Sequence, residues 1–249
     1  MTSRTDLNGT VALVTGGSRG IGAATAVRLA GRGADVAFTY VRDKDAADDV
    51  VRRVEALGRR ALALRADSAD ERETVAAVER TAERLGSPDI LVNNAAVGLL
   101  GPLDGFSPAD VDRVLAVGVR GAFLASQAAA RRMGPGGRII TIGTCMTQRV
   151  PGPGGTLYAT AKSALVGLTK ALARELGGRG ITANLVHPGP IDTDMNPADG
   201  PFAEGQTALT ALGRFGTADE VASMVAYLAG PEASYVTGAE FSVDGGHAA

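Results

Sequence analysis

Two side chains capable of acid–base chemistry, Tyr158 and Lys162, lie four positions apart in the segment Y-A-T-A-K. On a helix this spacing places both side chains on one face, about 6 Å apart along the axis. A free tyrosine has a pKa of about 10 and stays protonated at neutral pH. A nearby ammonium group stabilises the phenolate and moves that pKa toward the working pH. The pair therefore fits proton exchange with a substrate oxygen.

A second chemical signal is the glycine-rich segment T-G-G-S-R-G-I-G, which runs from Thr15 to Gly22 and leads into a helical pattern. Gly16 permits a tight turn, Gly20 lets backbone amides approach a pyrophosphate, and Gly22 lets a helix pack closely on the preceding strand. The helix N-terminus then faces the anion. The spacing differs from G-x-G-x-x-G, so an ordinary glycine-rich turn stays open on this segment alone.

The elements that must position these residues follow from the alternation of short apolar runs with helical periodicity. The runs predict strands at 11–15, 35–40, 61–66, 89–93, 137–143, 181–187 and 239–243. The predicted helices are 20–31, 43–57, 69–85, 107–133, 157–177 and 217–229, with Asp43, Ser107 and Thr217 among the N-caps. This order predicts an α/β fold over 1–249: one Rossmann-type domain, a doubly wound parallel sheet of about seven strands with helices on both faces.

One long segment fits neither period. Residues 190–210 are rich in proline and glycine and show weak periodicity. In a compact domain such a segment is typical of a mobile lid over a binding site. We therefore expect a substrate lid at 190–210.

Composition excludes several classes of function. With 249 residues, 45% of them hydrophobic, the chain can bury a full core without disulfides or metals. A net charge of −2, with both signs interspersed, argues against nucleic-acid binding. Cys145 is the only cysteine and there are two histidines, so we expect neither an intrachain disulfide nor an ordinary zinc site. The absence of a long apolar stretch predicts no membrane partner and a soluble, cytoplasmic protein.

The motifs T-G-x-x-x-G-x-G, N-N-A-A at 93–96 and Y-x-x-x-K occur in this order, followed by P-G at 188–189 and V-D-G-G at 243–246. In this ordered set the chain resembles the short-chain dehydrogenase/reductase family from end to end. The resemblance implies hydride transfer between a nicotinamide cofactor and a carbonyl or alcohol carbon. Tyr158 would exchange the proton, and Lys162 would also hold the nicotinamide ribose. It further implies a homotetramer built on the helices at 107–133 and 157–177.

The choice of cofactor depends on the end of the second strand. NAD sites usually carry an acid there, whereas this chain has Tyr40, followed shortly by Arg42, with Arg19 inside the glycine turn. Two guanidinium groups suit a 2′-phosphate, so we expect NADPH/NADP+ rather than NADH, unless both arginines are merely solvated. By resemblance, Asp67 contacts the adenine ring. The expected cofactor contacts are Gly16, Ser18, Arg19, Gly20, Ile21, Gly22, Tyr40, Arg42, Asp67, Ser68, Asn94, Ala95, Tyr158, Lys162, Pro188, Gly189, Ile191 and Thr193.

The chain departs from the family pattern at two positions. The family places a serine 13 or 14 residues before the tyrosine, but here those positions hold Cys145 and Thr144. We expect Thr144 to take the catalytic role, because its hydroxyl can bond a carbonyl, with Cys145 as the alternative and more typical of a buried filler. The Asn of the family's proton relay is replaced by Gly118, where steric demand, an unwound turn or a substitute water could favour glycine. His187 ends a strand, and we expect a structural rather than an acidic role.

The resemblance, which is to 3-oxoacyl-thioester reductases and related ketoreductases, implies an NADPH-dependent reductase of a small-molecule ketone or a 3-oxoacyl thioester. Enoyl reductases of this lineage space their tyrosine and lysine more widely, and sugar-nucleotide epimerases carry a larger C-terminal region. The lid at 190–210 contains no Lys or Arg, which favours a small or neutral substrate. The competing hypothesis is a nucleotide-binding sensor or scaffold with impaired turnover, supported by Gly118 and the missing serine.

Overall fold

The computed structural model describes residues 7–249. Seven parallel strands form the central sheet in the order β3-β2-β1-β4-β5-β6-β9. These strands are β1 (Val11–Val14), β2 (Asp35–Tyr40), β3 (Ala61–Arg65), β4 (Ile90–Asn93), β5 (Arg138–Ile142), β6 (Thr182–Pro188) and β9 (Glu240–Val243). The doubly wound parallel sheet predicted from the apolar runs is confirmed.

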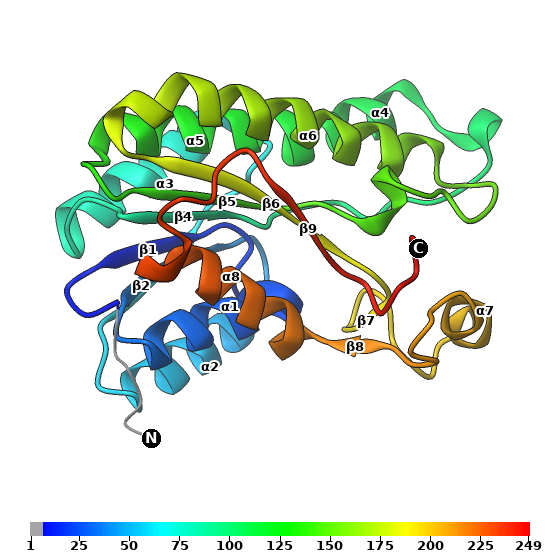
Figure 1. Ribbon diagram of the computed structural model, residues 1–249, viewed down its shortest axis with the longest axis horizontal. Coiled ribbons are helices and arrows are strands. Elements are labelled where there is room, and N and C mark those ends of the chain that lie inside the picture. Colours follow the sequence, from blue (N-terminus) through cyan, green and yellow to red (C-terminus); the bar gives the residue numbers. More distant parts are fainter. Residues whose placement is uncertain (1–6) are drawn as a thin grey trace.

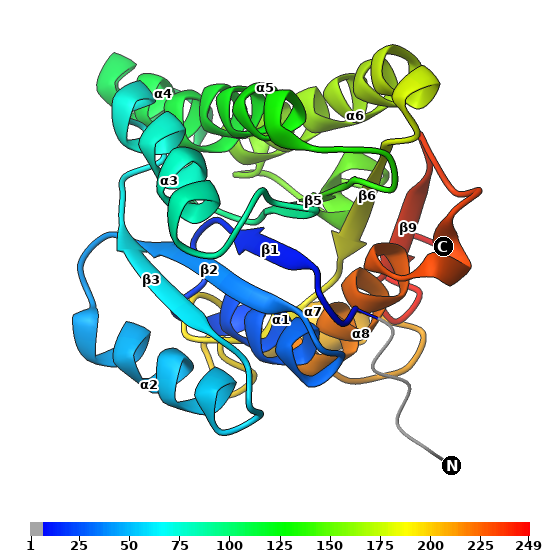
Figure 2. The ribbon, with the colours of Figure 1, turned by 90° about the vertical axis from the view of Figure 1, so that its left-hand side faces the viewer.

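Helices cover both faces of this sheet (Figures 1 and 2). The main helices are α1 (Gly20–Gly31), α2 (Lys44–Glu55), α3 (Glu71–Arg84), α4 (Pro108–Leu115), α5 (Gly121–Arg132), α6 (Thr156–Leu176) and α8 (Ala218–Ala229). One layer consists of α3, α4, α5 and α6, and the other of α1, α2 and α8. Central strands such as β1 are buried along their whole length, because helices exclude water from both sides.

The helix starts agree with the capping residues seen in the sequence. The side chain of Asp43 accepts a hydrogen bond from the backbone N–H of Ala46. Ser107 and Thr217 each form a capping box, with Asp110 and Glu220 respectively. Each cap satisfies backbone donors that the first helical turn leaves unpaired.

The helix predicted over 107–133 is not continuous. A π-helical turn, η2 (Ala116–Arg120), separates α4 from α5 and contains Gly118. Just after it, Gly121 packs against the Ser68 backbone, where a Cβ would lie 2.5 Å from the carbonyl oxygen. Apolar periodicity does not register such a turn, because one extra residue shifts the helix face while leaving the pattern on either side intact.

The strand order reverses direction at β1, because β2 and β3 lie on one side of β1 and β4 lies on the other. In a doubly wound sheet the carboxyl ends of the strands at such a switch point leave a crevice for a ligand. The glycine-rich turn follows β1, and the N-N-A-A segment closes β4. Two motifs far apart in the sequence therefore meet at one edge of the sheet.

The segment expected to be a lid carries local structure of its own (Figure 1). A two-stranded sheet pairs β7 (Ile191–Asp192) with β8 (Gly216–Thr217), and α7 (Ala203–Ala208) lies between them in the chain. Reciprocal amide hydrogen bonds of 2.9 and 3.0 Å join Asn196 to Gln206. From residue 7 onward, no helix combines the length and apolar character that crossing a bilayer requires.

Candidate active site

The turn after β1 has a backbone that only glycine fits easily. Gly16 and Gly20 have φ angles of 65° and 52°, in the left-handed region. A Cβ on Gly22 would collide with the carbonyl oxygen of Gly16, so α1 starts directly against the turn. Arg19 occupies the N-cap of α1, and its side chain makes no capping hydrogen bond. The first amides of α1 are left facing the crevice, as an anion-binding cradle requires.

Asn94 and Thr15 fix the shape of this cradle. The side-chain amide of Asn94 donates to the carbonyl oxygens of Thr15 and Gly16, at 3.0 and 2.9 Å. The Thr15 hydroxyl in turn accepts from the backbone N–H groups of Asn94 and Ala95. The Asn94 side chain therefore holds the glycine turn itself. Sequence reasoning missed the role of Thr15, although it opens the T-G motif.

Two cationic side chains, Arg42 and Arg113, lie near Asp67 at the adjoining edge, beyond β2. Arg19 and Arg42 are both exposed. Asp67, at the end of β3, forms a 2.9 Å ion pair with Arg113 and accepts from the N–H of Ala69. Burial raises the pKa of Asp67, but those hydrogen bonds and the charges of Arg113 and Arg42 outweigh it and lower the pKa. Arg42 is thus electrostatically coupled to the end of β3.

On the opposite side of the crevice, Tyr158 and Lys162 project from α6. Lys162 is 4% exposed, and its Nζ lies 6.0 Å from the centre of the Tyr158 ring. Nζ donates a 2.7 Å hydrogen bond to the carbonyl oxygen of Ile142, the last residue of β5. Burial lowers the pKa of Lys162 to about 8. The lysine is therefore held in place by the sheet and not by a carboxylate.

The pKa of Tyr158 moves in the direction opposite to the sequence expectation. Burial is the larger cause and raises this pKa, while hydrogen bonding with the Thr144 side chain lowers it by less. The expectation considered the nearby ammonium group but not the loss of water around the phenol. Without a cofactor, Tyr158 is therefore a protonated acid at neutral pH.

The side chains of Thr144 and Cys145 interact with each other but differ in their further hydrogen-bond partners. The Thr144 hydroxyl interacts with Tyr158 and accepts from the backbone N–H of Met146 at 3.3 Å. The Cys145 Sγ instead lies 3.5 Å from Nδ1 of His247. Burial, and then the charge of Asp244, raise the pKa of the Cys145 thiol to about 11. This geometry favours the Thr144 hydroxyl over the Cys145 thiol as the hydrogen-bonding group beside Tyr158.

Gly118 is buried in the π-turn, yet a Cβ built on it meets no atom within 4 Å. Steric demand therefore does not explain glycine at this position. Gly118 does lie in a π-helical turn, which agrees with the unwound turn that the sequence analysis gave as one of its explanations.

Two residues of the segment 190–210, Thr193 and Met195, lie beside the crevice. A Cβ on Gly20 would lie 3.3 Å from Cγ2 of Thr193, and one on Gly98 would lie 2.8 Å from Sδ of Met195. Gly189 packs against the Asp244 backbone, where a Cβ would lie 2.6 Å from Cα. Thr193 therefore lies against the glycine turn, and Met195 lies against the loop after β4.

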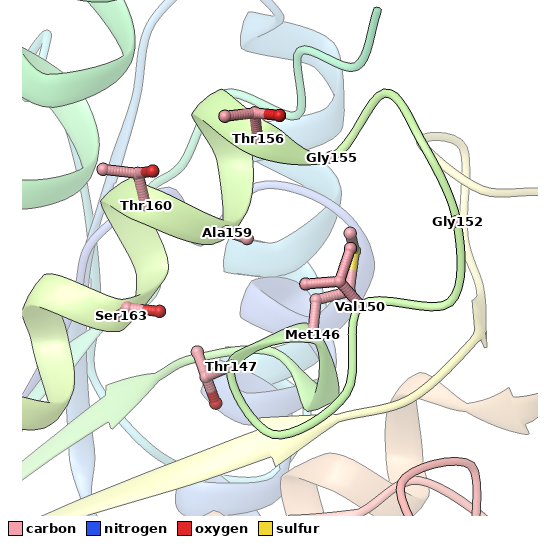
Figure 3. Close-up of a pocket in the computed structure, with 9 residues that line it drawn as sticks. All are labelled: Met146, Thr147, Val150, Gly152, Gly155, Thr156, Ala159, Thr160 and Ser163. Carbon is pink, nitrogen blue, oxygen red and sulfur yellow. The ribbon is translucent and has the colours of Figure 1, made fainter.

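A cavity of about 560 Å³ opens on another side of α6 (Figure 3). It is lined by Met146, Thr147 and Val150 of the loop after β5 and by Thr156, Ala159 and Ser163 of the helix, among others. Tyr158 and Lys162 do not line it, because they project from the neighbouring helix face. Within residues 7–249, no cluster of three or more His, Cys, Asp or Glu side chains is arranged to hold a metal.

Comparisons with known proteins agree with this architecture. A family model described as enoyl-(acyl carrier protein) reductase matches residues 16–248. The cyclic-di-GMP-binding biofilm dispersal mediator protein of Escherichia coli is 46% identical, over 95% of this chain and 96% of its own. A 3-oxoacyl-[acyl-carrier-protein] reductase of Synechocystis is 39% identical, over 97% and 98%.

A solved structure shares both fold and sequence. The blue fluorescent protein from a metagenomic library, crystallised with NADPH, superposes with a TM-score of 0.96 at 55% identity, covering 98% of this chain and 100% of that one. The order of motifs, the seven-stranded sheet and these relatives agree along almost the whole length. The chain belongs to the short-chain dehydrogenase/reductase family.

Proposed function

We propose that this protein is an NADPH-dependent oxidoreductase that interconverts a ketone and the corresponding alcohol. The observation that carries the proposal is the grouping of Tyr158, Lys162 and the Thr144 hydroxyl across the crevice from a preformed glycine cradle. NADPH in a relative at 55% identity supports the same choice of cofactor. Direction is set by the ratio of oxidised to reduced cofactor, since the chemistry is reversible.

The residues present fit a dinucleotide phosphate. The cradle around Gly16, Gly20 and Gly22 leaves backbone donors for the pyrophosphate, and a Cβ at Gly22 would collide with the Gly16 carbonyl oxygen and the Asn94 amide that shape it. Ser18, Ile21 and Ala95 border this cradle by their place in the chain, and Ser68 would lie with Asp67 toward the adenine end of the cofactor. Arg19 and Arg42 would hold the 2′-phosphate beside Tyr40, while Pro188, Gly189, Ile191 and Thr193 would frame the nicotinamide. When bound, the cofactor supplies the hydride that reduces a carbonyl carbon.

The chain's own residues handle the oxygen and its proton. The Thr144 hydroxyl would donate to the carbonyl oxygen and hold it beside Tyr158, and the phenol of Tyr158 would donate its proton to that oxygen. Lys162, whose Nζ keeps two further donors after bonding Ile142, would stabilise the phenolate left behind and hold the ribose hydroxyls. Low accessibility of Lys162 strengthens this electrostatic effect.

For the substrate, we propose a 3-oxoacyl thioester or a small neutral ketone, enclosed by a mobile lid at 190–210. The lid lacks Lys and Arg, and the Synechocystis relative is named a 3-oxoacyl reductase. The experiment is a spectrophotometric screen of 3-oxoacyl thioesters, cyclic ketones and diketones with NADPH and with NADH. Turnover with NADPH on at least one class is expected, and a chain inactive on the whole panel would contradict the proposal.

A second candidate function is a nucleotide-binding sensor with little turnover. The E. coli relative at 46% identity, named for binding cyclic di-GMP, favours it, as does Gly118 in place of the relay residue. Calorimetric titration with cyclic di-GMP, with and without saturating NADPH, separates the two. Tight binding by a chain that reduces no ketone would select the sensor.

We also propose a homotetramer, in a cytoplasmic location. The outward face of α5 and α6 offers half-exposed Phe123, which lines a groove together with Leu172. An apolar helix face of this kind suits helix-pair packing between copies.

A further inference from the structure

The turn that carries Thr144 is anchored by one fully buried histidine. His187, at the end of β6, has an exposed fraction of 0%. Its Nδ1 lies 2.9 Å from the carbonyl oxygen of Thr144, 3.3 Å from the Thr144 backbone nitrogen and 3.2 Å from the Thr147 hydroxyl. A neutral ring accepts from the Thr144 N–H, whereas a protonated ring donates to the Thr144 carbonyl, which also accepts from the Thr147 hydroxyl. In each form, Nδ1 therefore bonds one of the two peptide groups that flank Thr144.

The other ring nitrogen is held just as firmly. His187 Nε2 lies 3.0 Å from the carboxylate of Glu240 on β9, and the second carboxylate oxygen of Glu240 lies 2.8 Å from Nζ of Lys170. The Lys170 hydrogen bond is the main cause that lowers the pKa of Glu240, so the carboxylate is ionised and accepts from Nε2. Lys170 belongs to α6, the helix that carries Tyr158. The chain of contacts therefore links the Thr144 turn to the tyrosine's own helix.

The backbone before Thr144 makes such an anchor necessary. Gly143 lets the imidazole approach, since a Cβ there would lie 2.7 Å from Nδ1 of His187. Glycine also leaves this joint with more conformational freedom than any other residue would. Without His187, the Thr144 N–H would lose its partner, and the Thr144 carbonyl would keep only its bonds from Thr147 within the same turn.

We propose that His187, braced by Glu240, is a positioning residue that fixes the Thr144 hydroxyl against Tyr158. The inference rests on the proposed function for its kinetic consequence, but the anchoring itself is independent of turnover. A histidine that merely fills the core would support folding and cofactor binding equally with or without the Thr144 hydroxyl. A positioning residue would act on the chemical step, and only while that hydroxyl is present.

The test combines amide exchange with a double-mutant cycle on the full-length protein. In His187→Ala, we expect the Thr144 amide to exchange faster, and kcat for the best ketone to fall about 30-fold while the Kd for NADPH stays within about twofold. In a Thr144→Val background, which keeps the backbone groups but lacks the hydroxyl, His187→Ala should change kcat by less than about threefold. If the losses of kcat caused by His187→Ala and Thr144→Val simply multiply in the double variant, the proposal is overturned.

The only other histidine supplies a matched control. His247 contacts the neighbouring Cys145 thiol and not Thr144, so His247→Ala should leave Thr144 exchange unchanged and combine multiplicatively with Thr144→Val. Should His187→Ala fail to fold, Glu240→Gln weakens the same anchor with the ring in place and should speed Thr144 exchange and lower kcat. Unchanged exchange in the folded variants would overturn the anchoring, whereas a wild type inactive on every ketone would overturn only the proposed function.

Discussion

The ammonium group of Lys162 is bonded to the sheet itself, 2.7 Å from the carbonyl oxygen of Ile142. The bond runs from the middle of α6 to the last residue of β5, directly before the turn that carries Thr144. A buried lysine with a backbone acceptor keeps its position but pays for the loss of hydration with a lowered pKa. The buried charge of Lys162, which the proposed chemistry uses, therefore lowers the free energy of unfolding.

Because burying this charge is unfavourable, we predict that Lys162→Met raises the free energy of unfolding at pH 7. The Lys162 pKa falls from 10.5 to about 8 on folding, equivalent to about 3 kcal/mol at most. Below pH 8 both states bind the proton and the folded state bears the full penalty. Between pH 8 and 10.5 only the unfolded chain keeps the Lys162 proton, so the free energy of unfolding of the wild type rises with pH. The difference in this free energy between Lys162→Met and the wild type therefore shrinks.

Urea unfolding of both proteins from pH 7 to 10 measures this difference. Lys44→Met, at an exposed lysine, is the control and should show little change. A Lys162→Met protein that is less stable at pH 7, or whose difference from wild type does not vary with pH, would contradict the prediction.

Tyr158→Phe should remove the transferable proton and little volume. We expect single-turnover hydride transfer to fall at least about 100-fold, with the Kd for NADPH nearly unchanged. Stopped-flow absorbance of NADPH gives the rate, and fluorescence titration gives the binding. Retention of the wild-type rate would show that Tyr158 is not the acid.

The double variant Arg19→Ala, Arg42→Ala should weaken NADPH by at least about tenfold and leave NADH nearly unaffected, because each guanidinium makes a charge-assisted bond to the 2′-phosphate. Calorimetric Kd values for both cofactors test it. Arg53→Ala, at an exposed arginine on α2, is the matched control. Equal loss of both cofactors would reject the assignment.

Gly118→Asn should fold and should change kcat by no more than about tenfold, or roughly 1.4 kcal/mol in activation free energy. A Cβ at this position meets nothing within 4 Å, so the first side-chain atom fits the π-turn without a clash. The comparison uses one ketone and a thermal melt of each protein. An inactive wild type made active by this substitution would instead support the sensor hypothesis.

Light scattering at micromolar concentration should give a tetramer. Phe123→Glu places a charge on the outward face of α5 and should yield a smaller assembly with an unchanged far-UV spectrum, because an unpaired charge is costly in an apolar interface. A monomeric wild type would refute the assembly.

The order of elements and the chemistry of the main groups were readable from the sequence, because they depend on local patterns. Apolar runs predicted all seven strands of the central sheet, and Asp43, Ser107 and Thr217 predicted where helices begin. The spacing of Tyr158 and Lys162 predicted their shared helix face. Each of these signals lies within a few residues of the feature it predicts.

Tertiary structure decided what depends on groups distant in the chain. It turned the Asn94 side chain onto the glycine turn, directed Thr144 toward Tyr158 and Cys145 toward His247, and inserted a π-turn at 116–120. It also reversed the expected shift of the Tyr158 pKa. No local pattern encodes these outcomes, because burial and hydrogen-bond partners arise only when separate strands and helices pack together and exclude water.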